Sequence, residues 1–215
     1  EKYGADALRV YELFIAPFEQ SVAWSDRGVQ GTYRFLGRFW NLVGAVVEAQ
    51  GSGVAVGEAE AEKGRQVLRA LNKTIRKVTR DMDAFRFNTA VSALMELQNQ
   101  VLDVWSSARG SLTLAQWREV VRDMTLLVCP MAPHVAAEVW ELLGHGDDVL
   151  DAPWPAWDEE LAADAVATVV VQVNGKLRDE LEVAADADAD QVKELALASP
   201  RVRQWTDGKQ VVKVI

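Results

Sequence analysis

Apolar residues recur at helical spacing through the first two thirds of the chain. Between Lys63 and Arg86, for example, they stand three and four residues apart and form one stripe of Leu68, Leu71, Ile75, Val78 and Met82. This spacing places them on one face of an amphipathic helix. The same pattern predicts a bundle of six helices with mostly short connections: Ala5 to Phe14, Ser25 (as the N-cap) to Glu48, Glu58 to Asp81, Asn88 to Ser106, Leu114 to Val128 and Pro133 to Leu143.

Capping residues support several of these helix ends. Ser25 and Thr113 can accept a hydrogen bond from the first turn of the helix that follows. Pro133 suits a first helical turn and Gly144 suits a helix end. In the second helix we expect an inner face made of Val29, Tyr33, Leu36, Trp40 and Val43.

The hydropathy pattern changes after Gly146. Residues 147–166 are acidic and include two of the six prolines, so we expect a linker there, and a mobile one. From Ala167 onward two strand-like runs flank Asn174-Gly175, which is the strongest short signal for a β-hairpin. We expect a helix capped by Asp188 and a further strand over Val211 to Ile215.

The predicted fold is therefore mainly α, with a helical bundle followed by a small α+β domain. We expect the bundle over 1–146, the acidic linker over 147–166 and the small domain over 167–215. GSGVAVG, at 51–57, is interpreted as a flexible connection within the bundle. The chain opens in mid-pattern at Glu1 and ends on the apolar run KQVVKVI, so we expect a fragment whose small domain is truncated.

Composition bounds the possible functions. A chain of 215 residues with 49% apolar residues can build a real core, and no apolar run approaches the ~18 residues of a membrane span. The single cysteine, Cys129, excludes an internal disulfide framework and suits a reducing cytosol. With two histidines besides, a structural zinc site is not expected.

Charge is distributed unevenly. The net charge of -9 belongs mostly to residues 146–215, which leaves the bundle nearly neutral. Lys63 to Arg86 nevertheless holds eight of the 23 basic residues, against only Asp81 and Asp83. Six cations fall on one arc of the predicted helix, opposite its apolar stripe, with no acid between them: Arg65, Arg69, Lys73, Arg76, Lys77 and Arg80. An ordinary solvated face usually mixes both signs, so this row favours an anionic partner such as a phosphate backbone.

The tip of the hairpin offers a second basic site. Lys176 and Arg178 alternate onto one face of the strand after Asn174-Gly175, so both cations are expected to project together. A plain solvated surface is an equally good interpretation of this pair.

The remaining candidate residues favour structural roles. The glycines of 51–57 lack the spacing of a nucleotide-binding loop. Cys129 lies in an apolar run, so we expect its thiol to be packed in the core. His134 lies at a helix start, so we expect a structural role for it. Glu159 and Glu160 are expected to be solvated. We therefore predict no catalytic residue, metal site or cofactor site in this chain.

Several segments together resemble the C-terminal part of bacterial leucyl-tRNA synthetases, in the class I aminoacyl-tRNA synthetase family. The pattern G-V-x-G-x-x-R-F-L-x-R-x-W from Gly28 to Trp40 and the hairpin VNGKLR resemble the leucine enzymes. YGAD and MAPH alone also fit the isoleucyl, valyl and methionyl relatives. The other matching segments are NKTIRKVTRDMDAFRFNTAVSALMEL, MAPHVAAEVWELLG and APWPAWD.

The resemblance implies a tRNA-binding role. It implies a bundle of the anticodon-binding type, with a stem-contact segment at 1–20, and a C-terminal domain that contacts tRNA. The partner would be tRNA-Leu, through its body, elbow and variable arm. The cations between Arg65 and Arg80 would then meet tRNA phosphates, and Asn174, Lys176 and Arg178 would belong to the contact surface of the small domain.

The resemblance also implies that this chain and the rest of the enzyme have different roles. The chain would position tRNA-Leu for ATP-dependent attachment of leucine to its 3′ end. The HIGH and KMSKS signatures and the editing insertion are absent, so the fragment is expected to be inactive alone. It needs no cofactor, and ATP and Mg²⁺ belong to the full-length enzyme. We expect a cytoplasmic monomer without membrane contact.

Two alternatives stay open. One is a helical protein-interaction module whose basic face meets an acidic partner. The other is the equivalent part of an isoleucyl-, valyl- or methionyl-tRNA synthetase.

Overall fold

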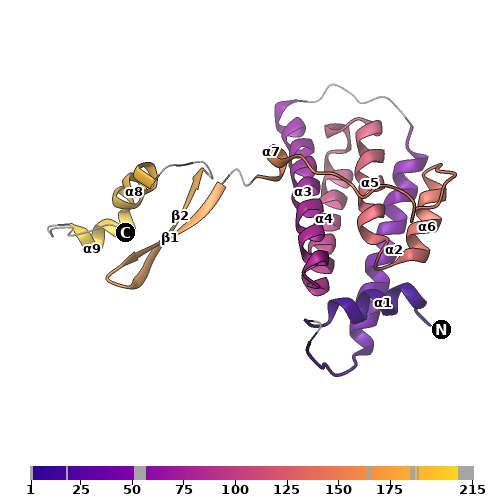
Figure 1. Ribbon diagram of the computed structural model, residues 1–215. Coiled ribbons are helices and arrows are strands. Elements are labelled where there is room, and N and C mark those ends of the chain that lie inside the picture. The colour runs from indigo at the N-terminus through magenta and orange to yellow at the C-terminus, as the bar shows by residue number, and fades with distance from the viewer. Residues whose placement is uncertain are drawn as a thin grey trace. The chain divides into compact units, whose positions relative to one another are not determined.

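The computed structural model describes residues 2–17, 19–50, 57–163, 166–184, 187 and 189–207. The chain divides into two compact units, Glu1–Ala162 and Ala163–Ile215. The first unit is a helical bundle and the second is a small α+β unit (Figure 1). The prediction of a mainly α chain with this order of parts is confirmed.

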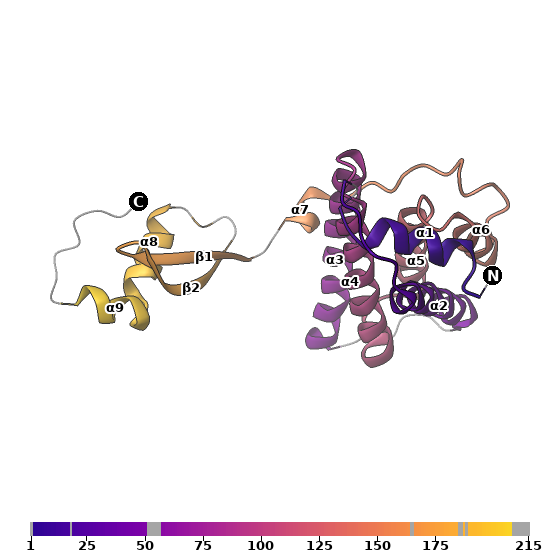
Figure 2. The same ribbon diagram turned by 90° about the horizontal axis from the view of Figure 1, so that it is seen from below.

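The bundle follows the predicted helices closely. Its elements are α1 (Ala5–Phe14), α2 (Asp26–Glu48), α3 (Glu58–Asp83), α4 (Phe87–Ser107), the 3-10 turn η1 (Arg109–Ser111), α5 (Leu114–Val128), α6 (Pro133–Leu142) and α7 (Glu159–Ala162). Helices α3 and α4 pack as a neighbouring pair, α1 packs on α2 and α4, and α2 also meets α5 and α6 (Figure 2). In the part of the chain described, no helix is long and apolar enough to cross a membrane.

The caps that the sequence indicated are present. The Ser25 side chain accepts a hydrogen bond from the Gly28 N–H, at 3.4 Å. Thr113 and Gln116 form a reciprocal capping box at the start of α5. Pro133 occupies the first turn of α6. These local signals fix the helix starts, which explains why the sequence located them well.

The inner face of α2 was predicted only in part. Val29, Leu36 and Val43 are buried as expected. Tyr33 and Trp40, however, are 51% and 41% exposed, so their assignment to the core was wrong. They lie at the edge of the apolar stripe, and the inner positions are taken instead by Thr32, Phe35, Phe39, Leu42 and Val46.

Residues 147–162, where the sequence suggested a linker, lie on the bundle. Trp140 donates its indole N–H to Asp147, at 3.1 Å, and Val149 is buried beside Cys129. Farther along, Trp157 packs against the main core and Ala162 is fully buried. The first compact unit therefore extends to Ala162.

The second unit is built around a hairpin. Strands β1 (Val166–Val173) and β2 (Lys176–Ala184) pair antiparallel, and α8 (Ala189–Ala198) and α9 (Pro200–Thr206) follow. Asn174 and Gly175 both have positive φ, 52° and 74°, as a two-residue hairpin turn requires. Asp188 and the strand expected over Val211 to Ile215 lie outside the described residues.

One glycine permits a close helix contact. A Cβ on Gly64, in α3, would lie 2.3 Å from the backbone oxygen of Ser111. A Cβ on Gly44, in α2, would meet nothing within 4 Å. The two sites are matched because both glycines lie inside long helices.

We expect Gly64→Ala to destabilise the bundle by about 1–3 kcal/mol, since the turn at Ser111 must shift. Gly44→Ala should instead stabilise it by about 0.5–1 kcal/mol, through higher helix propensity. Urea unfolding followed by circular dichroism measures both changes. A Gly64→Ala variant as stable as Gly44→Ala would contradict the close packing of α3 on η1.

Candidate nucleic-acid interface

The first two cations of the α3 row are paired with acids. Arg65 forms ion pairs with Glu58 and, at 2.6 Å, with Glu62, and Arg69 reaches Glu62 at 2.8 Å. The hydrogen bond from Arg65, with that from Arg69, holds the pKa of Glu62 below its usual value. The expectation of an acid-free row was therefore wrong at this end of the helix. Both acids precede Lys63 in the sequence.

Asp81 pairs with a third cation of the row. It is almost completely buried and accepts hydrogen bonds from Lys77 at 2.8 Å, Thr89 at 2.7 Å and Arg86 at 2.9 Å. Burial alone would raise the pKa of Asp81, but these donors outweigh it and the pKa lies below its usual value. Asp81 therefore joins the end of α3 to the start of α4.

The six cations of α3 do not all lie on one side of the helix. Arg76 is bound to α7, whereas Arg80 is exposed. Arg69, Lys73 and Lys77 line a groove of about 350 Å³ between α3 and α4, together with Gln66, Glu96 and Gln100. The structure thus brings three of the six predicted cations into one groove and turns Arg76 away from it.

A second basic surface lies on α2. Arg27, Arg34 and Arg38 are all exposed, and no acid occurs between Asp26 and Glu48. Their spacing of seven and four residues puts them on one side of the helix. Arg38 donates to Asn99 of α4, at 3.1 Å, while Arg27 and Arg34 make no ion pair with any residue that the structure describes. We call these three residues the α2 arginine row.

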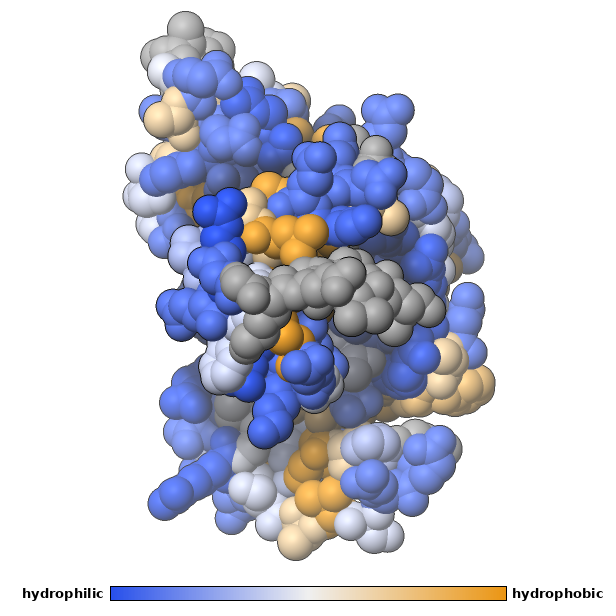
Figure 3. All heavy atoms as spheres, turned by 90° about the vertical axis from the view of Figure 1, so that its left-hand side faces the viewer, coloured by the Kyte–Doolittle hydropathy of each residue, from blue (hydrophilic) through white to orange (hydrophobic). Residues whose placement is uncertain are grey.

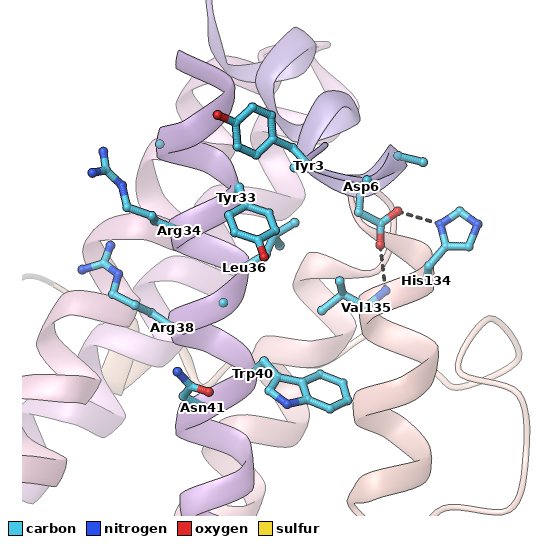
Figure 4. Close-up of a pocket in the computed structure, with 15 residues that line it drawn as sticks. Tyr3, Asp6, Tyr33, Arg34, Leu36, Arg38, Trp40, Asn41, His134 and Val135 are labelled. Atoms are coloured by element: carbon cyan, nitrogen blue, oxygen red, sulfur yellow. Dashed lines mark hydrogen bonds and ion pairs between the residues drawn. The ribbon is translucent and has the colours of Figure 1, made fainter. Parts of the chain in front are cut away.

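Arg34 and Arg38 of the α2 arginine row line an open groove. The groove measures about 1140 Å³ and is lined by α1, α2 and the start of α6. Figure 4 shows Arg34 and Arg38 projecting to the same side of α2, with Tyr33 and Trp40 on the side toward α6. Gly31 and Gly37 carry no side chain, and a Cβ at either position would lie in open space with nothing within 4 Å.

His134 has a structural contact at the rim of this groove. Its Nδ1 lies 2.7 Å from Oδ1 of Asp6, and the other oxygen of Asp6 accepts the Val135 N–H at 2.7 Å. The pair joins α1 to the first turn of α6 (Figure 4). Cys129 is buried, and burial raises the pKa of its thiol. Among the described residues no cluster of His, Cys, Asp and Glu could hold a metal ion.

The hairpin tip differs from the prediction at Arg178. Asn174 and Lys176 are exposed, but the strand register shifts where Val171 pairs with Asp179 and Gln172 with Leu177. This bulge leaves Arg178 without an opposite residue and breaks the alternation that would align it with Lys176. The Arg178 guanidinium instead lies 3.5 Å over the ring of Trp205 in α9. The expectation that both cations project together was therefore wrong.

One face of the protein is largely polar. In the face shown by Figure 3, hydrophilic residues cover most of the visible area and hydrophobic ones form small separate patches. A polar surface with a local arginine row suits a charged partner.

Sequence comparison places the chain in a family. Residues 64–194, more than half of the chain, match the family described as the anticodon-binding domain of tRNA ligase, and the chain belongs to it. It is more closely similar to bacterial leucine–tRNA ligases, and the match is to their C-terminal part. It is 42% identical to the enzyme of Geotalea daltonii and 41% identical to that of Rubrobacter xylanophilus, over 100% of this chain and 26% and 25% of those proteins. The chain spans about a quarter of the length of these relatives.

A solved structure supports the same relationship. The chain matches the LeuRS of Agrobacterium radiobacter K84, from a ternary LeuRS–tRNA–LeuAMS complex, with a TM-score of 0.78 and 28% identity. The match covers 99% of this chain and 27% of that one. The resemblance inferred from the sequence segments is confirmed, and it is the leucine branch that the comparisons support.

Sequence reasoning missed the α2 arginine row. Its signal was present, because 20 residues without an acid follow Arg27 and the three arginines share a helix face. The denser cluster of cations on α3 is the more prominent signal in the sequence.

We expect Asp81→Asn to lower the stability of the bundle by about 2 kcal/mol at neutral pH, since three donors lose their charged acceptor. The pKa of Asp81 is lowered by folding, so this advantage is fully present above the unfolded value of about 3.9 and is lost as the pH falls through the folded value. Urea unfolding of both proteins across this pH range measures it. Asp103→Asn, at an exposed carboxylate, is the control and should change stability by less than about 0.5 kcal/mol. A difference between wild type and Asp81→Asn that stays constant down to the lowest pH would contradict the role given to the Asp81 carboxylate.

Proposed function

We propose that this chain is the tRNA-binding portion of a leucine–tRNA ligase, and that it positions tRNA-Leu so that its 3′ end can receive leucine. The α2 arginine row carries this proposal. It is exposed, it has no carboxylate partner in the described part of the chain, and it lies in the compact unit that contains most of the residues matched to the tRNA-ligase family. The tRNA present with the structural relative supports the same partner.

Arginine suits this role physically. A guanidinium is always charged and can donate two parallel hydrogen bonds to one phosphate. Arg34 and Arg38 are one helical turn apart, so they can contact phosphates along one strand of a helical stem. Gly31 and Gly37 beside them allow the backbone of an RNA to approach α2 closely.

The α3–α4 groove is proposed as a second contact. Arg69, Lys73 and Lys77 line it in successive turns. Arg69 pairs with Glu62, and an exposed ion pair is worth only about 0–1 kcal/mol. A phosphate can therefore compete for Arg69, although at a greater cost than at the α2 row, whereas Lys77 is held more firmly by the buried carboxylate of Asp81. Arg65 and Arg80 flank this surface as weaker contributors.

The small unit is proposed to contribute through Asn174 and Lys176, which are exposed at the hairpin turn. Arg178 stabilises this part of the unit by stacking on Trp205. The proposed target of the small unit is the elbow and variable arm of tRNA-Leu.

The whole enzyme is proposed to bind ATP and Mg²⁺ in its other domains and to act as a cytoplasmic monomer. This chain contributes positioning, because holding two reactants in the correct geometry lowers the barrier of their reaction by several kcal/mol.

The test is the salt dependence of tRNA-Leu binding by Arg34→Ala with Arg38→Ala. Each lost phosphate contact reduces the slope of log K against log salt by about 0.7–0.9. We expect the double variant to bind more weakly and to lose about 1.4–1.8 from the slope. Fluorescence titration of labelled tRNA between low and moderate salt measures both quantities.

The matched control is Arg118→Ala with Arg122→Ala, which removes the same charge from the exposed side of α5. It should leave the slope nearly unchanged. Equal slopes for the two double variants would refute a specific contact at α2. Retention of an acidic protein in place of tRNA would favour the protein-interaction alternative.

A further inference from the structure

One face of α3 is occupied by the chain itself. Asn72, Arg76 and Thr79 stand at positions i, i+4 and i+7, and each binds the segment Trp154–Ala162. The Asp158 N–H donates to Oδ1 of Asn72 at 2.7 Å, and the Trp154 indole N–H donates to Oγ1 of Thr79 at 2.8 Å. We call residues 154–162 the strap.

Arg76 makes the central contacts with the strap. Its Nη2 donates to the carbonyl of Ala162 at 2.6 Å, and its Nη1 donates to Oε2 of Glu159 at 3.2 Å. Ala162 is the last residue of α7, and the final carbonyls of a helix have no partner within it. The Arg76 side chain is only 23% exposed as a result. It is therefore a poor candidate for an RNA contact.

Hydrogen bonds within the strap also stabilise it. The Asp158 side chain accepts the backbone N–H groups of Glu160, at 2.8 Å, and Leu161, at 3.2 Å. Trp157 donates its indole N–H to Glu159 at 2.8 Å. Hydrogen bonds from Trp157 and Arg76, with the nearby charge of Arg80, hold the pKa of Glu159 below its usual value. Glu159 thus presents a charged carboxylate to Arg76.

We propose that Arg76 is a positioning residue, which fastens the strap to α3 and thereby fixes the point where the chain leaves the bundle. The boundary between the two compact units falls directly after Ala162, the residue whose carbonyl Arg76 holds. With the strap fastened, the tether to β1 consists of residues 163–165. Arg76 thus acts on tRNA binding through the reach of the second unit. This inference rests on the proposed function only where it concerns tRNA.

The consequence is a large change in tether length. A tether of three residues spans at most about 10 Å. If the strap were released as far as Val149, which is buried, the tether would comprise residues 150–165 and span up to about 55 Å. Effective concentration falls roughly as the −3/2 power of tether length, so the gain from binding one RNA with both units would fall about tenfold.

The experiment compares Arg76→Ala with Arg80→Ala in the 215-residue chain. Both remove one positive charge from the same helix, but the exposed Arg80 side chain makes no hydrogen bond or ion pair with a described residue and acts on Glu159 only through its charge. Hydrogen–deuterium exchange of peptides within 154–162 and the maximum dimension from small-angle X-ray scattering are measured without RNA. We expect faster exchange and a larger maximum dimension for Arg76→Ala only. Circular dichroism checks that the bundle remains folded.

A second variant keeps the charge. Thr79→Val removes the acceptor of Trp154 and should change exchange and dimension in the same direction as Arg76→Ala. Wild-type exchange and dimension in both Arg76→Ala and Thr79→Val would overturn the proposal. These measurements need no tRNA, so a negative result would overturn the role of Arg76 without bearing on the proposed function.

Binding of tRNA-Leu then distinguishes positioning from contact. Arg76→Ala should weaken binding, by up to about tenfold if the strap is fully released, with an unchanged salt slope, because no phosphate contact is lost. A slope reduced by about 0.7–0.9 would overturn the positioning role and make Arg76 a phosphate ligand.

Discussion

The carboxylates around α3 determine which cations this chain can offer to a partner. Glu58 and Glu62 bind Arg65 and Arg69 at one end, Asp81 binds Lys77 at the other, and Glu159 binds Arg76 between them. The pairs of Glu58, Glu62 and Asp81 lie within α3, and the pair of Glu159 joins the helix to the strap. Asp81 also accepts a hydrogen bond from Thr89 of α4. The helix with the most positive charge is therefore largely structural, and α2 carries the arginines with the least competition.

Several features converge on α2 as the RNA-facing helix. Arg34 and Arg38 project together, two glycines beside them carry no side chain, and exposed Tyr33 and Trp40 line the adjoining groove (Figure 4). Phosphate contacts of this kind fix the register of a protein on RNA without reading its sequence. Under the proposed function, discrimination among tRNAs would depend on where the second unit can reach, and in our proposal the strap limits this reach.

The features that could be predicted from the sequence are those that depend on local signals. Helix starts followed from caps such as Ser25 and Thr113, and the hairpin followed from Asn174-Gly175. The sequence could not predict contacts between distant residues. Glu159 lies 83 positions from Arg76, so no helical pattern connects them. The bulge at Arg178 depends on strand register, and the exposure of Trp40 depends on how α6 packs. Neither can be predicted from the periodicity of the sequence.

Arginine-specific footprinting tests the account most directly. The free chain and its complex with tRNA-Leu are treated with a dicarbonyl reagent, and modified sites are quantified by mass spectrometry. Arg27, Arg34 and Arg38 should react readily in the free chain and be protected by tRNA. Arg76 should react slowly in both states, because the strap already covers it. Unprotected α2 arginines, together with an Arg76 that is reactive alone and protected by tRNA, would contradict the account.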